Sequence, residues 1–461
     1  MLNFWDFSAW GSINLFVVLL VSLLAANMLK RSVPFLRASL IPTSVLAGGM
    51  LVLVEAVYRW ITGDAMFDTA FFGGNGTANL ELLTYHTLAL GFIASSFKTS
   101  GGKLTKERTV EIFNTGVTTV ATYLLQAVLG LAISLVAALL VKDFFKAAGI
   151  LLPFGYGQGT GQAMNYGTIY ENDHGFVGGK SFGLTIAALG FLSASFGGVV
   201  HLNILRKKGL VKPQNCKEGA LQSEQIQGND EIPMQESIDK MTIQIALIGA
   251  AYLLAYLLMM LLGKLLPGMR SVIYGFNFLL GVISATVLKS LMNFLRKKNL
   301  IHREYANDFL MTRASNFFFD LMVVAGIAAI RLSALENYWG IILIMGVVGL
   351  FTTYFYNLFI AKKLFPKYAQ EQFLTMYGML TGTASTGVIL LREIDGEFKT
   401  PASDNMVYQN FPAIVFGFPL MLLATLAPVK PYLTLIILIG FFLVMNLILF
   451  RSFIFKKKEK K

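Results

Sequence analysis

Long apolar stretches without charge recur along almost the whole chain. Four of them are 112–141, 181–205, 241–263 and 431–450, and each supplies the roughly 20 residues that a helix needs to cross a bilayer. With 55% hydrophobic and 14% charged residues, the chain lies far from the roughly 25% charged composition of water-soluble domains, which excludes a soluble enzyme. The stretches are too long and unbroken for barrel strands, and helices are the other element that spans a bilayer. The sequence predicts an all-α polytopic membrane protein.

The positive charge of the chain reflects membrane topology. The formal net charge is +12, but the 38 Lys and Arg residues lie almost entirely between the apolar stretches, not along one face or in one tail. This distribution favours the lipid bilayer as the partner and argues against nucleic acid.

Thirteen apolar segments form two similar series, separated by a polar stretch that cannot be buried in lipid. The first series has six segments and the second has seven, whose first six follow their counterparts at a nearly constant separation. The sequence predicts an N-terminal repeat at 1–205, a cytoplasmic linker at 206–240, a C-terminal repeat at 241–428, and an extra transmembrane helix with a basic tail at 429–461. The segments lie near residues 8–29, 38–60, 81–97, 112–141, 147–171, 181–205, 241–263, 271–293, 312–330, 338–361, 371–391, 404–428 and 431–450.

The fifth segments of the two series match residue by residue. Aligned without gaps, the stretch from Tyr156 to Ala163 and the stretch from Tyr377 to Ala384 share Tyr, Gly, Thr, Gly and Ala, in the register that the apolar pattern gives independently. Both segments also carry glycines at mid-segment, where glycine breaks a helix. We therefore expect a broken or re-entrant hairpin in each. The glycines are Gly155, Gly157, Gly159, Gly161, Gly378, Gly382 and Gly387.

Such hairpins determine the topology of the two series. A hairpin that enters and leaves the membrane on the same side is not a crossing, so each series has five crossing helices. Because five is an odd number, the second series starts on the opposite side of the membrane and has the inverted orientation. The prediction is two inverted-topology repeats of five transmembrane helices plus one re-entrant hairpin each, with an extra C-terminal helix. With the linker in the cytoplasm, 30 of the 38 Lys and Arg residues are cytoplasmic, as the positive-inside rule requires. The expected location is the cytoplasmic membrane, with the N-terminus outside and the C-terminus inside.

Paired broken segments in an inverted repeat predict a transport site near the middle of the membrane. The N-termini of half-helices present free N–H groups and a partial positive charge, which suit a carboxylate. Unwound carbonyls and hydroxyls suit Na⁺, and glycine lets a substrate approach the backbone. The predicted substrate-binding residues are Gly157, Gln158, Gly159, Thr160, Gly161, Gln162, Thr381, Gly382, Thr383, Ser385 and Thr386.

Two motifs and the repeat organisation resemble the sodium:glutamate symporter family. The motifs are Ile41 to Thr43 followed by Ala47 to Gly49, and Gly157 to Gly161; the resemblance covers about residues 8–428. It implies Na⁺-coupled uptake of glutamate, two re-entrant loops with Gly-rich tips near the substrate, and elevator-like movement of a transport domain. The family's Gly-Gly-His-Gly-Thr-Gly pattern has Tyr156 in place of a glycine here, and Gln158 in place of the histidine. A homodimer is the expectation by analogy with elevator-like carriers.

Polar residues outside the glycine clusters are weaker candidates. Asp320 is the one acidic residue well inside an apolar segment, where it is either a cation or proton site or a structural partner of a neighbouring side chain. Asn316 is a second candidate Na⁺ ligand, although polar bonding between helices is the commoner use of such a residue. Two histidines, His86 and His201, are expected to be hydrogen-bonded structural groups. The pair Asp404-Asn405, after a proline and before an apolar stretch, predicts a helix N-cap.

These observations favour a secondary active transporter: a Na⁺-coupled symporter of glutamate, with alternating access and no cofactor beyond the coupling ion. The alternative is a Na⁺- or H⁺-coupled carrier of another small carboxylate or amino acid on the same fold. An enzyme is not expected, because the sequence has no His-Glu-x-x-His, Gly-x-Gly-Asp or Gly-x-Ser-x-Gly motif. A channel is not expected either, because no selectivity-filter sequence is present.

Overall fold

The regular structure of the protein is helical. The computed structural model describes residues 4–97, 105–209, 231–234, 237–395 and 399–454. Within these ranges all regular elements are helices, apart from one isolated bridge between Glu231 and Glu304. Most of the predicted linker, 206–240, lies outside the described residues.

Nine of the described helices are long and apolar enough to cross a membrane, and a bent pair makes a tenth if it is counted as one span. This finding confirms the predicted polytopic helical membrane protein. The bent pair is α16 (Ala402–Tyr408) with α17 (Asn410–Leu426). The predicted segment near 81–97 is α4 (Gly76–Ser96), which is helical but is not among the nine. The nine are α1 (Phe7–Ser32), α3 (Thr43–Thr62), α5 (Lys106–Leu140), α7 (Gly179–Lys207), α9 (Lys240–Leu265), α11 (Asn277–Lys297), α12 (Asp308–Ala328), α13 (Trp339–Leu364) and α18 (Pro431–Leu449).

The ends of several helices follow from the local sequence. The hydroxyl of Thr105 accepts a hydrogen bond from the Arg108 amide and caps α5, and the Asp239 carboxylate accepts one from the Met241 amide and caps α9. Pro431 occupies the first turn of α18, where its missing N–H costs nothing. Gly175 ends the helix before it in the left-handed conformation, with φ 70°.

The chain divides into two compact units, each built from residues on both sides of the polar stretch. The first unit comprises Met1–Val21, Val57–Gly101 and Cys216–Ala328. The second comprises Ser22–Ala56, Gly102–Asn215 and Ala329–Lys461. The division into two inverted repeats concerns the order of elements along the chain, and it stays a prediction.

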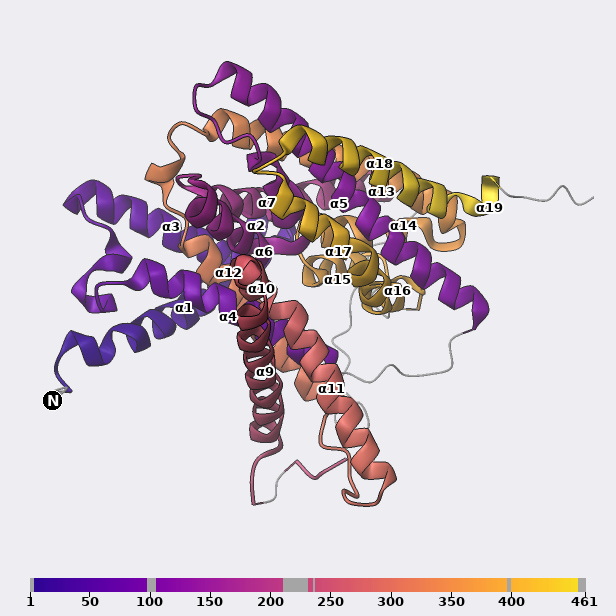
Figure 1. Ribbon diagram of the computed structural model, residues 1–461, viewed down its shortest axis with the longest axis horizontal. Helices are drawn as coiled ribbons and strands as arrows, with labels where there is room; N and C mark the ends of the chain where they lie inside the picture. Colours follow the sequence, from indigo (N-terminus) through magenta and orange to yellow (C-terminus); the bar gives the residue numbers. More distant parts are fainter. Residues whose placement is uncertain (1–3, 98–104, 210–230, 235–236, 396–398, 455–461) are drawn as a thin grey trace, which may run out of the picture. The chain divides into compact units, whose positions relative to one another are not determined.

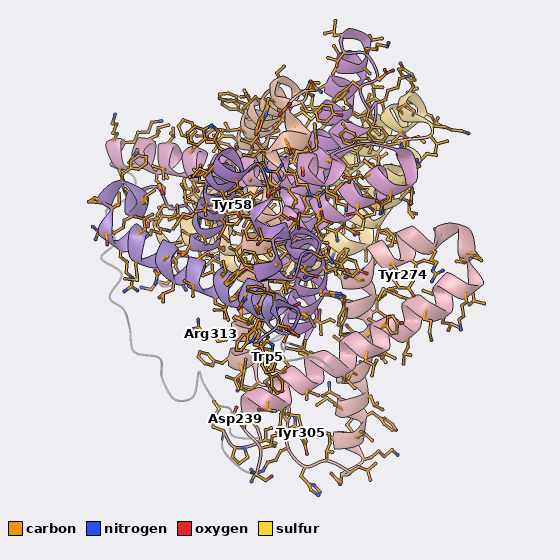
Figure 2. All side chains as sticks on the ribbon, turned by 90° about the vertical axis from the view of Figure 1, so that its left-hand side faces the viewer. Trp5, Tyr58, Asp239, Tyr274, Tyr305 and Arg313 are labelled. Atoms are coloured by element: carbon orange, nitrogen blue, oxygen red, sulfur yellow. The ribbon has the colours of Figure 1, made fainter. Side chains whose placement is uncertain are left out.

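Helices α4, α9, α11 and α12 form the core of the first unit. Small and aliphatic side chains let these helices approach closely, among them Ala94, Ala251, Ala285 and Ala314. At one end, Gln244 of α9 donates a hydrogen bond to the Tyr305 carbonyl, 2.8 Å away. Figure 2 shows Asp239 and Tyr305 close together at this end.

A buried ion pair lies beside this end of the first unit. The Lys240 side chain is fully buried, and its Nζ donates to Glu231 Oε2 at 2.7 Å. Asn307 Nδ2 donates to the same carboxylate oxygen at 2.6 Å. Since the lysine has no access to water, the carboxylate is what neutralises it.

The Glu231→Gln variant is expected to lower the free energy of unfolding by about 3–5 kcal/mol, because it leaves the Lys240 charge buried without its counter-ion. The measurement is thermal unfolding of the purified protein in detergent. A double variant, Glu231→Gln with Lys240→Met, should regain most of the loss. Equal stability of the single variant and the wild-type protein would contradict the prediction.

The second unit contains α5, α7, α13, the bent pair α16 and α17, and the extra C-terminal helix. Figure 1 shows α18 running along α5, and the two are in contact. After α18, Arg451 donates to Asn114 Oδ1 of α5 at 3.0 Å and lies over the Phe113 ring, 5.0 Å from its centroid. The predicted extra helix is therefore an integral part of this unit.

The prediction that Asp404 and Asn405 cap a helix was wrong. Both lie inside α16, which begins at Ala402 after Pro401 and has no side-chain cap. Asn405 is fully buried and donates to the Tyr368 hydroxyl and to Gln372 Oε1. The side chain of Asn405, which the local sequence predicts to cap a helix, thus forms tertiary hydrogen bonds instead.

Candidate functional site

The first glycine cluster forms a helical hairpin. Helix α6 (Leu151–His174) contains a break at Gly159, where φ is 79° and ψ is −169°. The rings of Phe154 and Tyr166 stack across the break, with centroids 4.0 Å apart and planes 13° from parallel. In a continuous helix these twelve steps would separate the two residues by about 18 Å. The two arms therefore lie side by side, with Gly159 at the tip.

The second glycine cluster forms a hairpin of the same kind. Helix α14 (Ala369–Thr381) and helix α15 (Ala384–Arg392) are separated by Gly382 and Thr383, which have non-helical backbone angles. A Cβ added to Gly378 would lie 2.8 Å from the Cα of Gly387 in the other arm. The backbones of the two arms are thus in contact, and glycine at both positions is what permits it. The helix breaks that the sequence predicts are present in both segments.

The two hairpins meet at helix α7. A Cβ on Gly190 would lie 2.5 Å from the Thr381 carbonyl oxygen of the second hairpin and 3.2 Å from the Tyr156 Cα of the first. One turn further, Ser193 binds both hairpins. Its hydroxyl lies 2.9 Å from the Tyr156 hydroxyl, and its carbonyl accepts from the Tyr377 hydroxyl at 2.8 Å. Tyr156 and Tyr377 are the aligned pair of the two sequence series, so equivalent positions converge on one residue.

The tips are mostly closed off from solvent. Gln158 and Thr383 are partly exposed, whereas the other predicted substrate-binding residues whose side chains are described are buried. Ser385 belongs to α15, and its side chain lies outside the described residues. The buried ones are Gly157, Gly159, Thr160, Gly161, Gln162, Thr381, Gly382 and Thr386. The structure therefore places the predicted residues in the same unit, and Gln158 and Thr383 are the two whose side chains keep some exposed surface.

The tips present hydrogen-bond donors. Gln162 Nε2 is buried and has no hydrogen-bond partner within the described part of the chain. Thr383 precedes α15, but its side chain does not cap the helix, so the first N–H groups of α15 are left for another acceptor. The N-terminus of a helix also carries a partial positive charge. An anion such as a carboxylate is the ligand that this chemistry favours.

Sequence reasoning missed the polar side chains that hold the hairpins from outside. The Tyr123 hydroxyl of α5 donates to the Gly157 carbonyl at 3.0 Å, and Gln126 Nε2 donates to the Leu380 carbonyl at 3.0 Å. The sequence did contain a sign of this polar face of α5, because four threonines recur at helical spacing before Gln126. They are Thr115, Thr118, Thr119 and Thr122, all buried.

The predicted cation ligands belong to the other unit. Asn316 and Asp320 lie four residues apart on α12, and both are exposed. Their role as Na⁺ ligands stays a prediction. The two histidines, in contrast, are confirmed as hydrogen-bonded groups: His86 Nδ1 lies 2.6 Å from the Tyr252 hydroxyl, and His201 lies within 2.8 Å of Tyr354 and Gln370.

No protein-family model matches the chain, and no curated protein matches it. The resemblance to the sodium:glutamate symporters thus depends on the motifs and the repeat pattern in the sequence.

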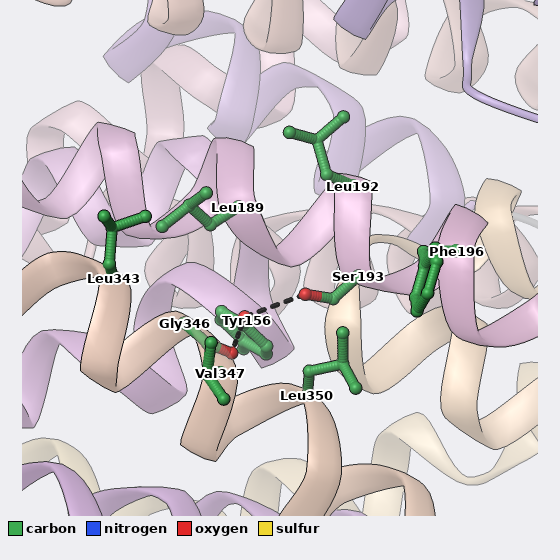
Figure 3. A pocket seen from close by; sticks show the side chains of 9 residues that line it. All are labelled: Tyr156, Leu189, Leu192, Ser193, Phe196, Leu343, Gly346, Val347 and Leu350. Atoms are coloured by element: carbon green, nitrogen blue, oxygen red, sulfur yellow. Dashed lines mark hydrogen bonds between the residues drawn. The ribbon is translucent and has the colours of Figure 1, made fainter.

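An apolar groove lies beside the hairpins. It has a volume of about 210 Å³ and is bounded by α7 and α13. Figure 3 shows leucine and valine side chains around it and the Tyr156 hydroxyl directed to Ser193 and Gly346. Because the one tyrosine hydroxyl is already hydrogen-bonded and the remaining lining is almost wholly apolar, the groove does not suit a carboxylate.

A buried carboxylate organises the chain that follows the second hairpin. Asp395 Oδ1 accepts from the Lys399 amide at 2.8 Å, and Oδ2 accepts from the Thr400 amide at 2.8 Å and the Thr400 hydroxyl at 2.6 Å. Burial raises the pKa of Asp395, but the hydrogen bonds from Thr400 and Lys399 favour the ionised form and hold the pKa below its usual value.

The Asp395→Asn variant is expected to unfold about 1–3 kcal/mol more easily than wild type at neutral pH, because the carboxylate bonds are lost. Since the folded pKa is lowered, the wild-type advantage is complete above the unfolded pKa of about 3.9 and disappears as the pH falls through the folded value. Thermal unfolding between pH 3 and pH 7 checks this. Exposed Asp404 is the control, whose change to Asn should have little effect at any pH. A difference that already shrinks above pH 5 would contradict the prediction.

Proposed function

We propose that the protein is a secondary active transporter that carries a small carboxylate across the cytoplasmic membrane together with Na⁺. Glutamate is the first candidate, through the resemblance to the sodium:glutamate symporters. The proposed mechanism is alternating access by an elevator-like movement, on two inverted repeats that each contain one re-entrant hairpin.

The observation that carries this proposal is the meeting of two broken helices at Gly190 and Ser193. Broken helices interrupt the hydrogen bonding of the backbone, which in a bilayer is tolerated where the backbone is buried in protein or lines a water-filled cavity. Discontinuous helices from two related halves form the binding sites of many secondary transporters. Two such helices whose tips converge within one unit thus support a transport site.

The donors at the tips support an anionic substrate. A carboxylate accepts hydrogen bonds from backbone N–H groups at the start of α15 and from the Gln162 amide nitrogen. The partly exposed Gln158 and Thr383 side chains then contact the rest of the substrate. In the resembling family the position of Gln158 holds a histidine, so Gln158 is the residue that we expect to adjust substrate choice.

The orientation is part of the proposal. It places the N-terminus outside and the C-terminus in the cytoplasm, as the distribution of Lys and Arg favours. The proposed assembly is a homodimer, by analogy with other elevator-like carriers.

The test is uptake of labelled L-glutamate into proteoliposomes, with an inward Na⁺ gradient compared with equal choline and with unlabelled competitors. Na⁺-dependent accumulation that glutamate competes supports the proposal in full. Accumulation that a different carboxylate competes, or that follows a proton gradient, supports the alternative carrier on the same fold. Failure to accumulate any carboxylate under either gradient, by protein that is folded and inserted, would overturn the proposed function.

A further inference from the structure

Helices α5 and α13 lie beside α14 of the second hairpin (Figure 1). Four buried polar side chains connect α5 and α13 there. Thr122 and Gln126 lie one turn apart on α5, Thr353 and Asn357 lie one turn apart on α13, and each is at most 1% exposed. Gln126 Nε2 donates to Thr353 Oγ1 at 2.8 Å and to the Leu380 carbonyl at 3.0 Å. Asn357 Nδ2 donates to the Thr353 carbonyl at 2.9 Å and to Thr122 Oγ1 at 3.4 Å. Both amides are therefore fixed on the same residue, Thr353.

Two oxygen atoms of this cluster are left over. Gln126 Oε1 and Asn357 Oδ1 are buried and have no hydrogen-bond partner among the described residues. The orientation of both amides is determined, because each nitrogen faces a backbone carbonyl, which can only accept. An amide turned the other way would place oxygen against oxygen. A buried acceptor without a partner costs free energy, so we expect an electropositive ligand to bind the two oxygens.

We propose that Gln126 Oε1 and Asn357 Oδ1 bind a dehydrated monovalent cation, with Thr122 Oγ1 as a further ligand. The Thr122 hydroxyl donates its proton to the Thr118 carbonyl at 2.8 Å and accepts from Asn357 Nδ2, which leaves one lone pair for the ion. Neutral oxygen ligands suit a hard cation. Ca²⁺ and Mg²⁺ sites are built around carboxylates, and the groups that form this cluster include none, so the charge of the ion is one.

The inference deepens the proposed function, on which it rests for the role of the ion. Gln126, whose oxygen binds the cation, holds with its nitrogen the carbonyl of Leu380, two residues before the break at Gly382. The ion thus fixes the amide that positions the second hairpin. This arrangement couples occupancy of the cation site to the geometry of the substrate site, as symport requires.

The test is thermal unfolding of the purified protein in detergent, with NaCl titrated against choline chloride at constant ionic strength and KCl as a second arm. Wild-type protein is expected to show a saturable rise in Tm of a few degrees, because an ion that binds the folded state stabilises it by mass action. The ion of the two that acts at lower concentration is the one that the site selects. A Tm that neither salt changes, compared with choline, means that the oxygens bind water, and it would overturn the inference.

Three variants locate the site. Thr122→Val removes one ligand at constant shape and is expected to raise the apparent Kd for the cation by about 10- to 100-fold. Gln126→Met and Asn357→Leu are expected to abolish the cation-dependent rise in Tm. Asn405→Leu is the matched control, because Asn405 Oδ1 is another buried oxygen without a partner in the described part of this unit, away from the cluster. An unchanged rise in Thr122→Val and in whichever of the two amide variants folds would overturn the assignment.

The two experiments distinguish a wrong cation site from a wrong transport function. If the cation-dependent rise in Tm is present in the wild-type protein and lost in the variants, but no carboxylate is accumulated, the cation site is supported and the proposed function is contradicted. If a carboxylate is accumulated and no variant alters the effect of cations on Tm, the proposed function is supported and the cation site is contradicted.

Discussion

Replacing Gly159 by alanine is expected to reduce substrate uptake by about 100-fold, with normal amounts of protein in the membrane. Gly159 has φ 79° and ψ −169°, a region of backbone conformation that is essentially restricted to glycine. A Cβ at this position introduces about 1–3 kcal/mol of strain, which the chain relieves by turning the tip of the first hairpin. A tip displaced by about 1 Å no longer presents Gln158 and the following N–H groups to the substrate in the productive geometry.

The measurement is the initial rate of uptake into proteoliposomes, normalised to the amount of reconstituted protein. Gly175→Ala is the matched control. Gly175 also has a positive φ, of 70°, but it lies at the far end of α6 with open space around it, so its replacement should leave uptake nearly unchanged. Wild-type rates in Gly159→Ala would show that the tip of the first hairpin is not part of the transport site.

Replacing Gly190 by alanine is expected to have an effect of similar size by a different route. The added methyl group would lie 2.5 Å from the Thr381 carbonyl oxygen and 3.2 Å from the Tyr156 Cα, so it pushes the two hairpins away from α7 and from each other. Overpacking of this kind costs about 1–3 kcal/mol, and the resulting displacement separates the two halves of the site. Uptake should again fall by about 100-fold.

The control for this variant is Gly440→Ala in α18, where the added methyl group would meet no atom within 4 Å. Thermal unfolding separates a misplaced site from a misfolded protein, since Gly190→Ala should still unfold cooperatively. Full uptake by a folded Gly190→Ala protein would mean that the contact of both hairpins with α7 has no role in transport.

The helices and the two breaks were predictable because both depend on local sequence. A bilayer-spanning helix needs a continuous apolar stretch, and the predicted segments correspond to helices of the structure. Glycines at mid-segment predicted breaks, and the breaks lie at Gly159 and at Gly382. The aligned pair Tyr156 and Tyr377 was found from the residue match, although the match could not show that both bind Ser193.

The polar cluster between α5 and α13 was not predictable from the sequence. Gln126 and Asn357 are single polar residues in long apolar stretches, and such residues commonly bond between helices without any ligand. Their importance depends on Thr353, which fixes both amides, and on the Leu380 carbonyl, which fixes the orientation of one. These relations exist only after distant segments have packed. The misassigned Asn405 shows the same limit, because a local capping pattern was overridden by tertiary hydrogen bonds.

The bond between Gln126 and the Leu380 carbonyl joins residues 254 positions apart in the chain. Ribosomes add about 5–20 residues per second, so about 10–50 s pass between the synthesis of the two residues. The arms of the first hairpin close over a dozen residues and need no such delay. For that interval, the part of the chain already made lies in the bilayer with the Gln126 amide not yet bonded to Thr353 and the Leu380 carbonyl. Nascent chains that stall between the two halves are therefore expected to be targets for membrane quality control.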